Sequence, residues 1–298
     1  MRWAIFMMFV CALSVSSPGR SVAADYFGIS YDPDGLSYVI ARVEGGNITA
    51  TQETKNAPKT GTSVSVFSIE RLFDGKYRLG KREWIDEVGQ DVYCFDDLKG
   101  FVFPADYGFQ VFCWTGNRNA IKQPQPLADR ETYAKFGAEF LASTAPAEHF
   151  DCTADNVYSI WKVDMDGNGQ DEVVYGIASG NVRGEDKGLN VPYPGECQTY
   201  LDAPGYSSLI LRYIGSEGNL KSDQLYFLDY ESTTQATDDP DSQGWMPEYY
   251  QLAGIIDLDG DGTYELVTKS AYYEGEGYDI WKYSPSGVEK VASFAYGL

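Results

Sequence analysis

The sequence predicts a mainly β protein built from antiparallel sheets. It contains 23 Tyr and 15 Phe in 298 residues, and aromatic residues are enriched in strands. Short apolar stretches alternate with turns throughout, in keeping with 31 Gly and 13 Pro. The second half also contains an internal repeat. The length allows one large domain or two ordinary ones.

The first 24 residues have the features of a secretory signal peptide. Arg2 precedes a short apolar run over residues 4–15, and small residues follow as far as Ala23 and Ala24. The run is too short to cross a bilayer as a stable helix. We therefore expect a secreted or periplasmic protein with no membrane span after signal cleavage.

The charge of the chain is strongly negative. Lys and Arg total 23 against 44 Asp and Glu, which gives a formal net charge of -21. Nucleic acid is excluded as an expected partner, because its recognition needs a basic surface that neutralises phosphates. An acidic surface keeps a protein soluble and also attracts cations.

Four cysteines follow the signal peptide, at Cys94, Cys113, Cys152 and Cys197. An even number in an exported chain suggests two disulfides, with three possible connectivities. We prefer the pairs Cys94–Cys113 and Cys152–Cys197, because each would join one local unit.

Residues 25–122 are expected to form an N-terminal β region. Its apolar stretches include residues 38–43, 63–67 and 109–114, and Gly45-Gly46 and Asp74-Gly75 mark turns between strands. Whether this region supplies degenerate repeats or a separate β domain stays open at the level of sequence.

Residues 123–150 are expected to form a linker and one helix. Gln123–Pro126 is typical of an extended linker. Residues 127–143 have helical signals, with Phe136, Phe140 and Leu141 spaced to form an apolar face.

Residues 151–298 contain two copies of the order strand, acidic loop, strand. The first loop is residues 164–172 and the second is residues 257–265, 93 positions later. Each copy offers about four strands, the content of a propeller blade, so we expect a β-propeller-like arrangement. The first copy carries a Gly- and Pro-rich insertion over residues 179–204, a length typical of functional loops.

The two loops place oxygen-bearing residues at alternate positions, as calcium requires. Calcium takes six to eight oxygen ligands, and the absence of nitrogen and sulfur donors disfavours zinc and copper. The EF-hand, which needs Glu at position 12, is excluded because Tyr175 and Thr268 stand there. The alternative is that the loops are only tight turns, but their repetition favours metal. The candidate ligands are Asp164, Asp166, Asn168, Gln170 and Glu172 in the first loop, and Asp257, Asp259, Asp261, Thr263 and Glu265 in the second.

The second loop has Asp261 where the first has Asn168. This adds one formal negative charge, so the sequence predicts tighter calcium binding by the second loop.

The pattern D-x-D-G-(D/N)-G-x-x-E between two hydrophobic strands resembles the FG-GAP/VCBS repeats of integrin-type β-propellers. The resemblance covers residues 156–298 and implies calcium held by the loop positions named above. Only two repeats are visible, whereas a closed propeller needs at least four blades.

No catalytic residue is assigned from the sequence. His149 is the single histidine, and the chain has no G-x-S-x-G, H-E-x-x-H or Walker motif. We expect an exported calcium-binding β-repeat protein that acts as a binding or scaffold module for a glycan or protein ligand. The alternative is a polysaccharide-acting hydrolase or lyase on the same framework. Aromatic residues that could stack on sugars, or simply pack in strands, are Tyr249, Tyr250, Tyr272, Tyr273 and Tyr278, with Trp245 nearby.

Overall fold

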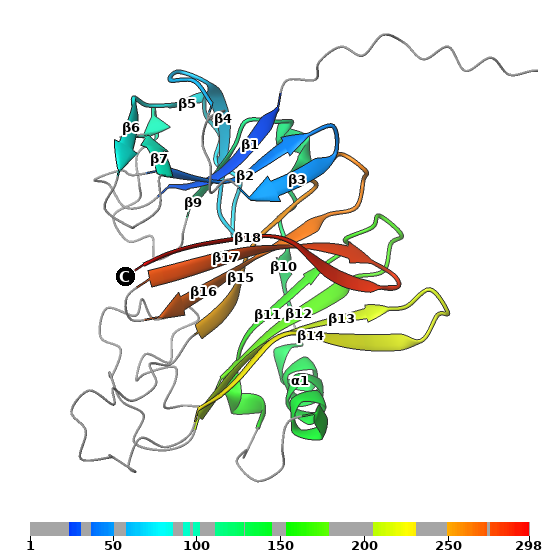
Figure 1. The fold of residues 1–298 in the computed structure, drawn as a ribbon. Coiled ribbons are helices and arrows are strands. Elements are labelled where there is room, and N and C mark those ends of the chain that lie inside the picture. The colour runs from blue at the N-terminus through cyan, green and yellow to red at the C-terminus, as the bar shows by residue number, and fades with distance from the viewer. Residues whose placement is uncertain are drawn as a thin grey trace, which may run out of the picture.

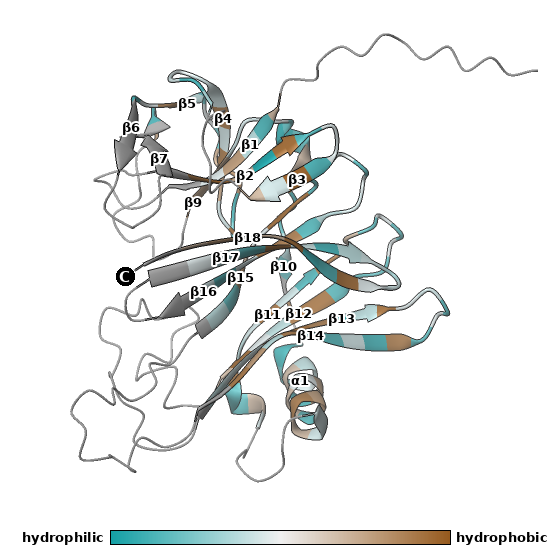
Figure 2. Cartoon of the chain, viewed as in Figure 1, coloured by the Kyte–Doolittle hydropathy of each residue, from teal (hydrophilic) through white to brown (hydrophobic). Residues whose placement is uncertain are grey.

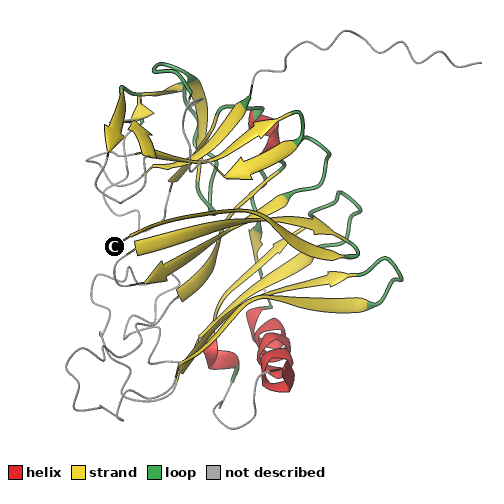
Figure 3. Ribbon diagram, viewed as in Figure 1, coloured by secondary structure: helices red, strands yellow, loops and turns green. Residues whose placement is uncertain are grey.

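The computed structural model describes residues 24–30, 37–50, 58–85, 92–95, 98–101, 111–127, 129–144, 153–178, 205–230, 249–272 and 275–297. Within these ranges the protein is mainly β, with antiparallel strand pairing and one α-helix, as the sequence predicts (Figure 3). No helix in these ranges is long and apolar enough to span a membrane. The signal peptide up to residue 23, His149 and the insertion 179–204 lie outside the described residues.

The N-terminal region forms one nine-stranded sheet. Its strand order is β6-β7-β2-β1-β9-β4-β5-β8, with β3 paired to β2. The strand β9 lies between β1 and β4, so the end of this region pairs with its beginning. This order differs from that of a four-stranded repeat, in which each strand pairs with the next one along the chain. In chain order the strands are β1 (Asp25–Ser30), β2 (Ser37–Glu44), β3 (Asn47–Ala50), β4 (Ser63–Phe67), β5 (Tyr77–Leu79), β6 (Arg82–Ile85), β7 (Val92–Phe95), β8 (Leu98–Lys99) and β9 (Val111–Trp114).

Two meanders of sequential strands follow, one for each sequence repeat (Figure 1). The prediction of four strands around each acidic loop is confirmed. Both hydrophobic and hydrophilic stretches lie on these strands (Figure 2). The first meander is β11 (Val157–Val163), β12 (Glu172–Ala178), β13 (Gly205–Ile214) and β14 (Leu220–Tyr230). The second is β15 (Tyr249–Ile256), β16 (Glu265–Tyr272), β17 (Gly275–Ser284) and β18 (Gly287–Gly297).

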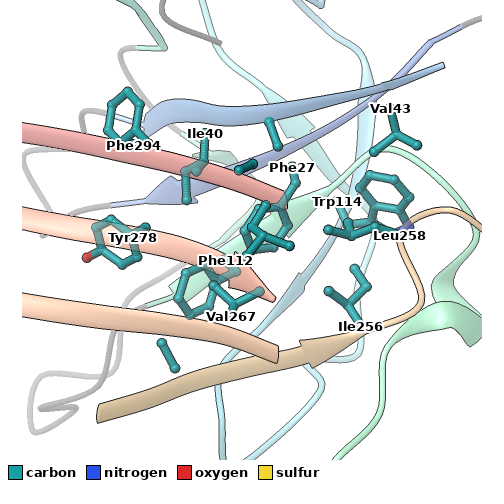
Figure 4. Close-up of a cluster of buried hydrophobic side chains, with 14 of the residues drawn as sticks. Phe27, Ile40, Val43, Phe112, Trp114, Ile256, Leu258, Val267, Tyr278 and Phe294 are labelled. Atoms are coloured by element: carbon teal, nitrogen blue, oxygen red, sulfur yellow. The ribbon is translucent and has the colours of Figure 1, made fainter. Parts of the chain in front are cut away.

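The three sheets stack in layers, with the second meander in the middle (Figure 1). One core cluster joins the N-terminal sheet to the second meander, where Phe112, stacked on Phe27, meets Tyr278 (Figure 4). Another joins the two meanders. The central strand β16 is therefore buried on both faces, with Val267 in the first cluster and Leu266 in the second. The layers form an open series, and the described residues contain no closed ring of blades.

The helix α1 (Arg130–Thr144) covers the outer face of the first meander. The predicted apolar face is only partly right: Leu141 is buried, but Phe136 is 41 % exposed. Small residues make the close contact instead, because a Cβ at Gly137 would lie 2.8 Å from the ring of Tyr175. The buried positions of the helix are Ala134, Gly137, Ala138 and Leu141.

The segment of residues 120–126, before the helix, contacts both meanders. Ala120 accepts a hydrogen bond from the backbone N–H of Asp257 at 2.8 Å, and the N–H of Lys122 donates to Ile255 at 3.0 Å. Further along the chain, β10 (Gln125–Pro126) pairs with the end of β11. Residues 120–126 therefore tie the two meanders together, next to the start of each acidic loop. The predicted linker supplies only the contact with the first meander, because Ala120 and Lys122 belong to the predicted N-terminal β region.

The preferred disulfide Cys94–Cys113 is wrong. Cys113 is buried and free, and burial raises the pKa of its thiol to about 12. Cys94 lies in β7 and Cys113 in β9, with β2 and β1 between them. Three strand spacings of about 4.8 Å exceed the Cα separation that a disulfide can bridge. Cys152 and Cys197 lie outside the described residues.

Candidate metal centres

Each acidic loop connects the first two strands of its meander. The first loop joins β11 to β12, and the second joins β15 to β16. In each, one oxygen from each of three carboxylates lies within 4.8 Å of the others. Like charges at such separations repel strongly unless a cation or a proton lies among them. The two groups are Asp164, Asp166 and Glu172, and Asp257, Asp259 and Glu265.

The same local hydrogen bonds shape both loops. In the first, the N–H of Asn168 donates to Asp166 Oδ1 at 3.1 Å, and that of Gly169 donates to Asp164 Oδ2 at 3.1 Å. In the second, Asp261 donates to Asp259 at 3.1 Å and Gly262 to Asp257 at 3.2 Å. The bonds that join residues two positions apart, from Asn168 to Asp166 and from Asp261 to Asp259, are Asx turns, which Asp favours. The bonds from the two glycines span five positions and close each loop onto its first aspartate. They aim the side chains of positions 1 and 3 into the loop.

Glycine is required at the bend of each loop. Gly169 has φ 83° and Gly262 has φ 90°, a left-handed conformation that residues with a Cβ rarely adopt. The bend lets the backbone return, so that the final glutamate of each loop faces the aspartates.

That final glutamate closes each loop from inside the protein. Glu172 is 1 % exposed and Glu265 is 0 % exposed. Each accepts a hydrogen bond from the backbone N–H of loop position 2: Met165 donates to Glu172 Oε2 at 2.8 Å, and Leu258 donates to Glu265 Oε2 at 2.7 Å. The glutamates therefore have fixed positions in both loops.

Two buried carboxylate oxygens have no hydrogen-bond partner among the described residues. They are Asp164 Oδ1 in the first loop and Glu265 Oε1 in the second. Unpartnered buried oxygens are rare and costly in folded proteins. A divalent cation held by oxygen ligands would satisfy both of them, so the residues fit such an ion.

The raised pKa of Glu265 shows that, without a cation, its negative charge is unfavourable in this buried cluster of carboxylates. Burial, together with the nearby charges of Asp259 and Asp257, raises its pKa to about 8. Burial also raises the pKa of Glu172. A carboxyl group whose charged form is this unfavourable is stabilised by a bound cation.

The remaining candidate ligands lie around these clusters. Asn168 accepts a hydrogen bond from Gln170 N at 2.7 Å and donates through Nδ2 to Asp166 at 3.0 Å. Thr263 N donates to Asp261 Oδ1 at 2.8 Å. Asp261 is not part of the carboxylate group in its loop. Its other oxygen, Oδ2, is 2.8 Å from the ammonium group of Lys282.

Sequence reasoning gave no role to two neighbours on β17. The ammonium group of Lys282 forms ion pairs with Asp259 and Asp261, which raise the pKa of Lys282. On the opposite side of the meander, the Tyr283 hydroxyl donates to Glu172 Oε1 at 3.1 Å. Their contacts depend on how strands pair and layers stack.

The two loops also touch each other across the layers. The backbone N–H of Tyr264, in the second loop, donates to the carbonyl of Met165, in the first, at 2.9 Å. Together with the Tyr283–Glu172 bond, this contact links the first loop to the second meander.

Replacing Tyr283 with phenylalanine should therefore destabilise the protein. Tyr283→Phe would leave Glu172 Oε1 buried without a donor, at a cost of about 1–3 kcal/mol. Urea unfolding in calcium-free buffer measures this cost. Tyr213→Phe is the matched control, because its ring packs against Tyr283 but its hydroxyl donates to Asp223. Equal losses in the two variants would contradict the special role of Tyr283.

Two candidate sugar-stacking tyrosines pack in the core instead. Tyr250 is 5 % exposed and Tyr278 is 1 % exposed. Tyr250 stacks on Tyr226, with ring centroids 4.1 Å apart. The structure does not describe the side chains of the other aromatic candidates.

Comparison with known proteins gave no matching family model, no matching curated protein and no matching solved structure. The geometry of the two loops is therefore the basis for a functional proposal.

Proposed function

We propose that this protein is an exported calcium-binding β-repeat protein that acts as a binding or scaffold module. The first loop would hold one ion through Asp164, Asp166, Asn168, Gln170 and Glu172. The second would hold another through Asp257, Asp259, Asp261, Thr263 and Glu265.

One observation carries this proposal: the same carboxylate cluster is built twice, at the same place in two meanders. A turn between strands needs only one or two Asx hydrogen bonds. It does not need a fully buried glutamate directed toward two aspartates, with an oxygen left unpartnered. A cation accounts for these features together.

The ligand types favour calcium over other cations. The donors are carboxylate, amide, hydroxyl and backbone oxygens, which suit calcium and magnesium rather than zinc or copper. Magnesium requires near-ideal octahedral geometry and keeps several waters, whereas calcium accepts a flexible, protein-rich shell. Loops that offer five candidate oxygen donors each suit calcium better.

Calcium would act here as a structural ion. The first loop contacts the second meander through Tyr264 and Tyr283, so an ion that fixes the loops also fixes the stacking of the layers. In this proposal the two meanders, which pack face to face, would be blades of a propeller-like arrangement. This agrees with the resemblance of the loops to FG-GAP/VCBS repeats.

Calorimetric titration with calcium chloride tests the proposal. We expect two ions per chain in the wild type, one in Glu172→Gln, one in Glu265→Gln and none in the double variant. Saturation at about 100 times the dissociation constant should stabilise the fold by about 2.7 kcal/mol per site. Thermal melts with calcium or with a chelator measure that gain.

Asp171→Asn is the matched control. Asp171 lies beside the first loop but pairs with Lys162 at 2.6 Å, outside the carboxylate cluster. This variant should keep both ions. No heat of binding in the wild type, together with melts that do not respond to calcium, would overturn the proposal.

A further inference from the structure

The second loop already contains a positive charge. The ammonium group of Lys282 contacts Asp259 Oδ2 and lies 2.8 Å from Asp261 Oδ2. Strand pairing holds it there: Trp281 pairs with Leu266 across β17 and β16, so Lys282 comes next to the start of β16, where Glu265 stands.

Lys282 contacts the carboxylate oxygens of Asp259 and Asp261 that accept no backbone hydrogen bond within the turn. Asp259 Oδ1 accepts the N–H of Asp261, and Asp261 Oδ1 accepts the N–H of Thr263. The second oxygen of each aspartate is therefore the one available to a metal ion. In the second loop, both of these oxygens contact Lys282.

The first loop has no such cation among the described residues. The corresponding position next to Glu172 is Tyr213, because Arg212 pairs with Val173. The Tyr213 hydroxyl donates to Asp223 instead. Lys162, the ion-paired lysine beside this loop, contacts Asp171, outside the cluster. Among the described residues, the donor to Asp166 Oδ2 is a neutral amide N–H, from Asn168.

The two sites therefore have the same net formal charge, so charge alone does not predict which of them binds calcium more tightly. The second loop carries four carboxylates and one lysine, a net of three negative charges, and the first loop carries three carboxylates among its candidate ligands. The charge added by Asp261 is offset by Lys282.

We infer that Lys282 is an internal counter-cation that competes with the divalent ion for Asp259 and Asp261. The second loop is then the weaker of two unequal sites, filled after the first as calcium rises. The inference rests on the proposed function, and it reverses the order of affinity that Asp261 alone predicts. Glu265 Oε1, buried and unpartnered, remains available to an ion once the lysine has moved.

Calorimetry on single-site proteins tests this competition. In the Glu172→Gln background only the second loop binds, and adding Lys282→Met should tighten its calcium affinity by at least about tenfold. The matched control is Lys162→Met in the Glu265→Gln background, where only the first loop binds. There the affinity should stay unchanged. Wild-type protein should show two steps, the weaker one missing in Glu265→Gln.

Lysine labelling gives a second measurement on the wild type, independent of how the variants fold. Reductive methylation, quantified by mass spectrometry, should label Lys282 more when calcium is added. Lys290, which pairs with Asp279 at 2.6 Å, should not change. Two bound ions with no tightening by Lys282→Met and unchanged Lys282 labelling would overturn the inference and leave the proposed function standing. No bound ions would remove the proposed function itself.

Discussion

Phe112→Ala is expected to destabilise the protein by about 3–5 kcal/mol, the cost of deleting a fully buried aromatic side chain. Phe112 is 0 % exposed and lies in β9 of the N-terminal sheet. Its ring stacks on Phe27 at 5.4 Å and meets the edge of Tyr278, on β17, at 6.2 Å (Figure 4). The cavity would open between the N-terminal sheet and the second meander, where few side chains can move in to fill it.

The same substitution tests whether the two halves of the chain fold together. If the shared core joins them, unfolding in urea should remain one transition by both tryptophan fluorescence and circular dichroism, with a lower midpoint. Phe136→Ala is the control, because this phenylalanine is 41 % exposed on α1. Its effect should stay below about 1 kcal/mol. An unchanged midpoint in Phe112→Ala would contradict the layered core.

Sequence alone predicts the local parts of the candidate sites well. Asx turns join residues two positions apart, such as Asp166 with Asn168, so their geometry is contained in the loop sequence. The strand pattern on either side is local too, and all four strands of each repeat follow from it. The closing positions, Glu172 and Glu265, therefore follow from the spacing of oxygen-bearing residues within each loop.

Contacts that depend on strand register and on the stacking of layers cannot be predicted from the local sequence of the loops. Lys282 meets Asp259 only because β17 pairs with β16 in one particular register, and a shift of one residue would turn its side chain to the other face. Tyr283 reaches Glu172 from another layer. Counting loop charges predicts a stronger second site because the count leaves out a lysine 21 positions after Asp261.

The N-terminal sheet and the helix show the same limit. Pairing of β9 with β1 joins residues more than 80 positions apart, and nothing in a local apolar pattern specifies that partner. On α1, spacing selects Phe136 as a core residue, yet the buried face consists of Leu141 together with the small residues Ala134, Gly137 and Ala138. Close packing against Tyr175, rather than hydrophobicity, decides which face of the helix is buried.

Glu265→Gln is expected to stabilise the calcium-free protein at alkaline pH, although it removes a calcium ligand. The pKa of Glu265 is about 8 in the folded state and about 4.3 when unfolded. Between these values the folded state keeps a proton that the unfolded state has released, so the stability of the wild type falls as pH rises across this window. Above about pH 8 the full cost of the buried charge is present.

The glutamine variant has no such ionisation, and its side-chain oxygen can still accept the N–H of Leu258. At pH 9 without calcium it should be more stable than the wild type by an amount on the order of 3–5 kcal/mol, and near pH 4 by little. With calcium the order should reverse, because only the wild type fills the second loop. Urea unfolding at several pH values, with and without calcium, measures both effects. A difference between the two proteins that does not vary with pH would show that Glu265 is not the buried, ionisable centre of the second loop.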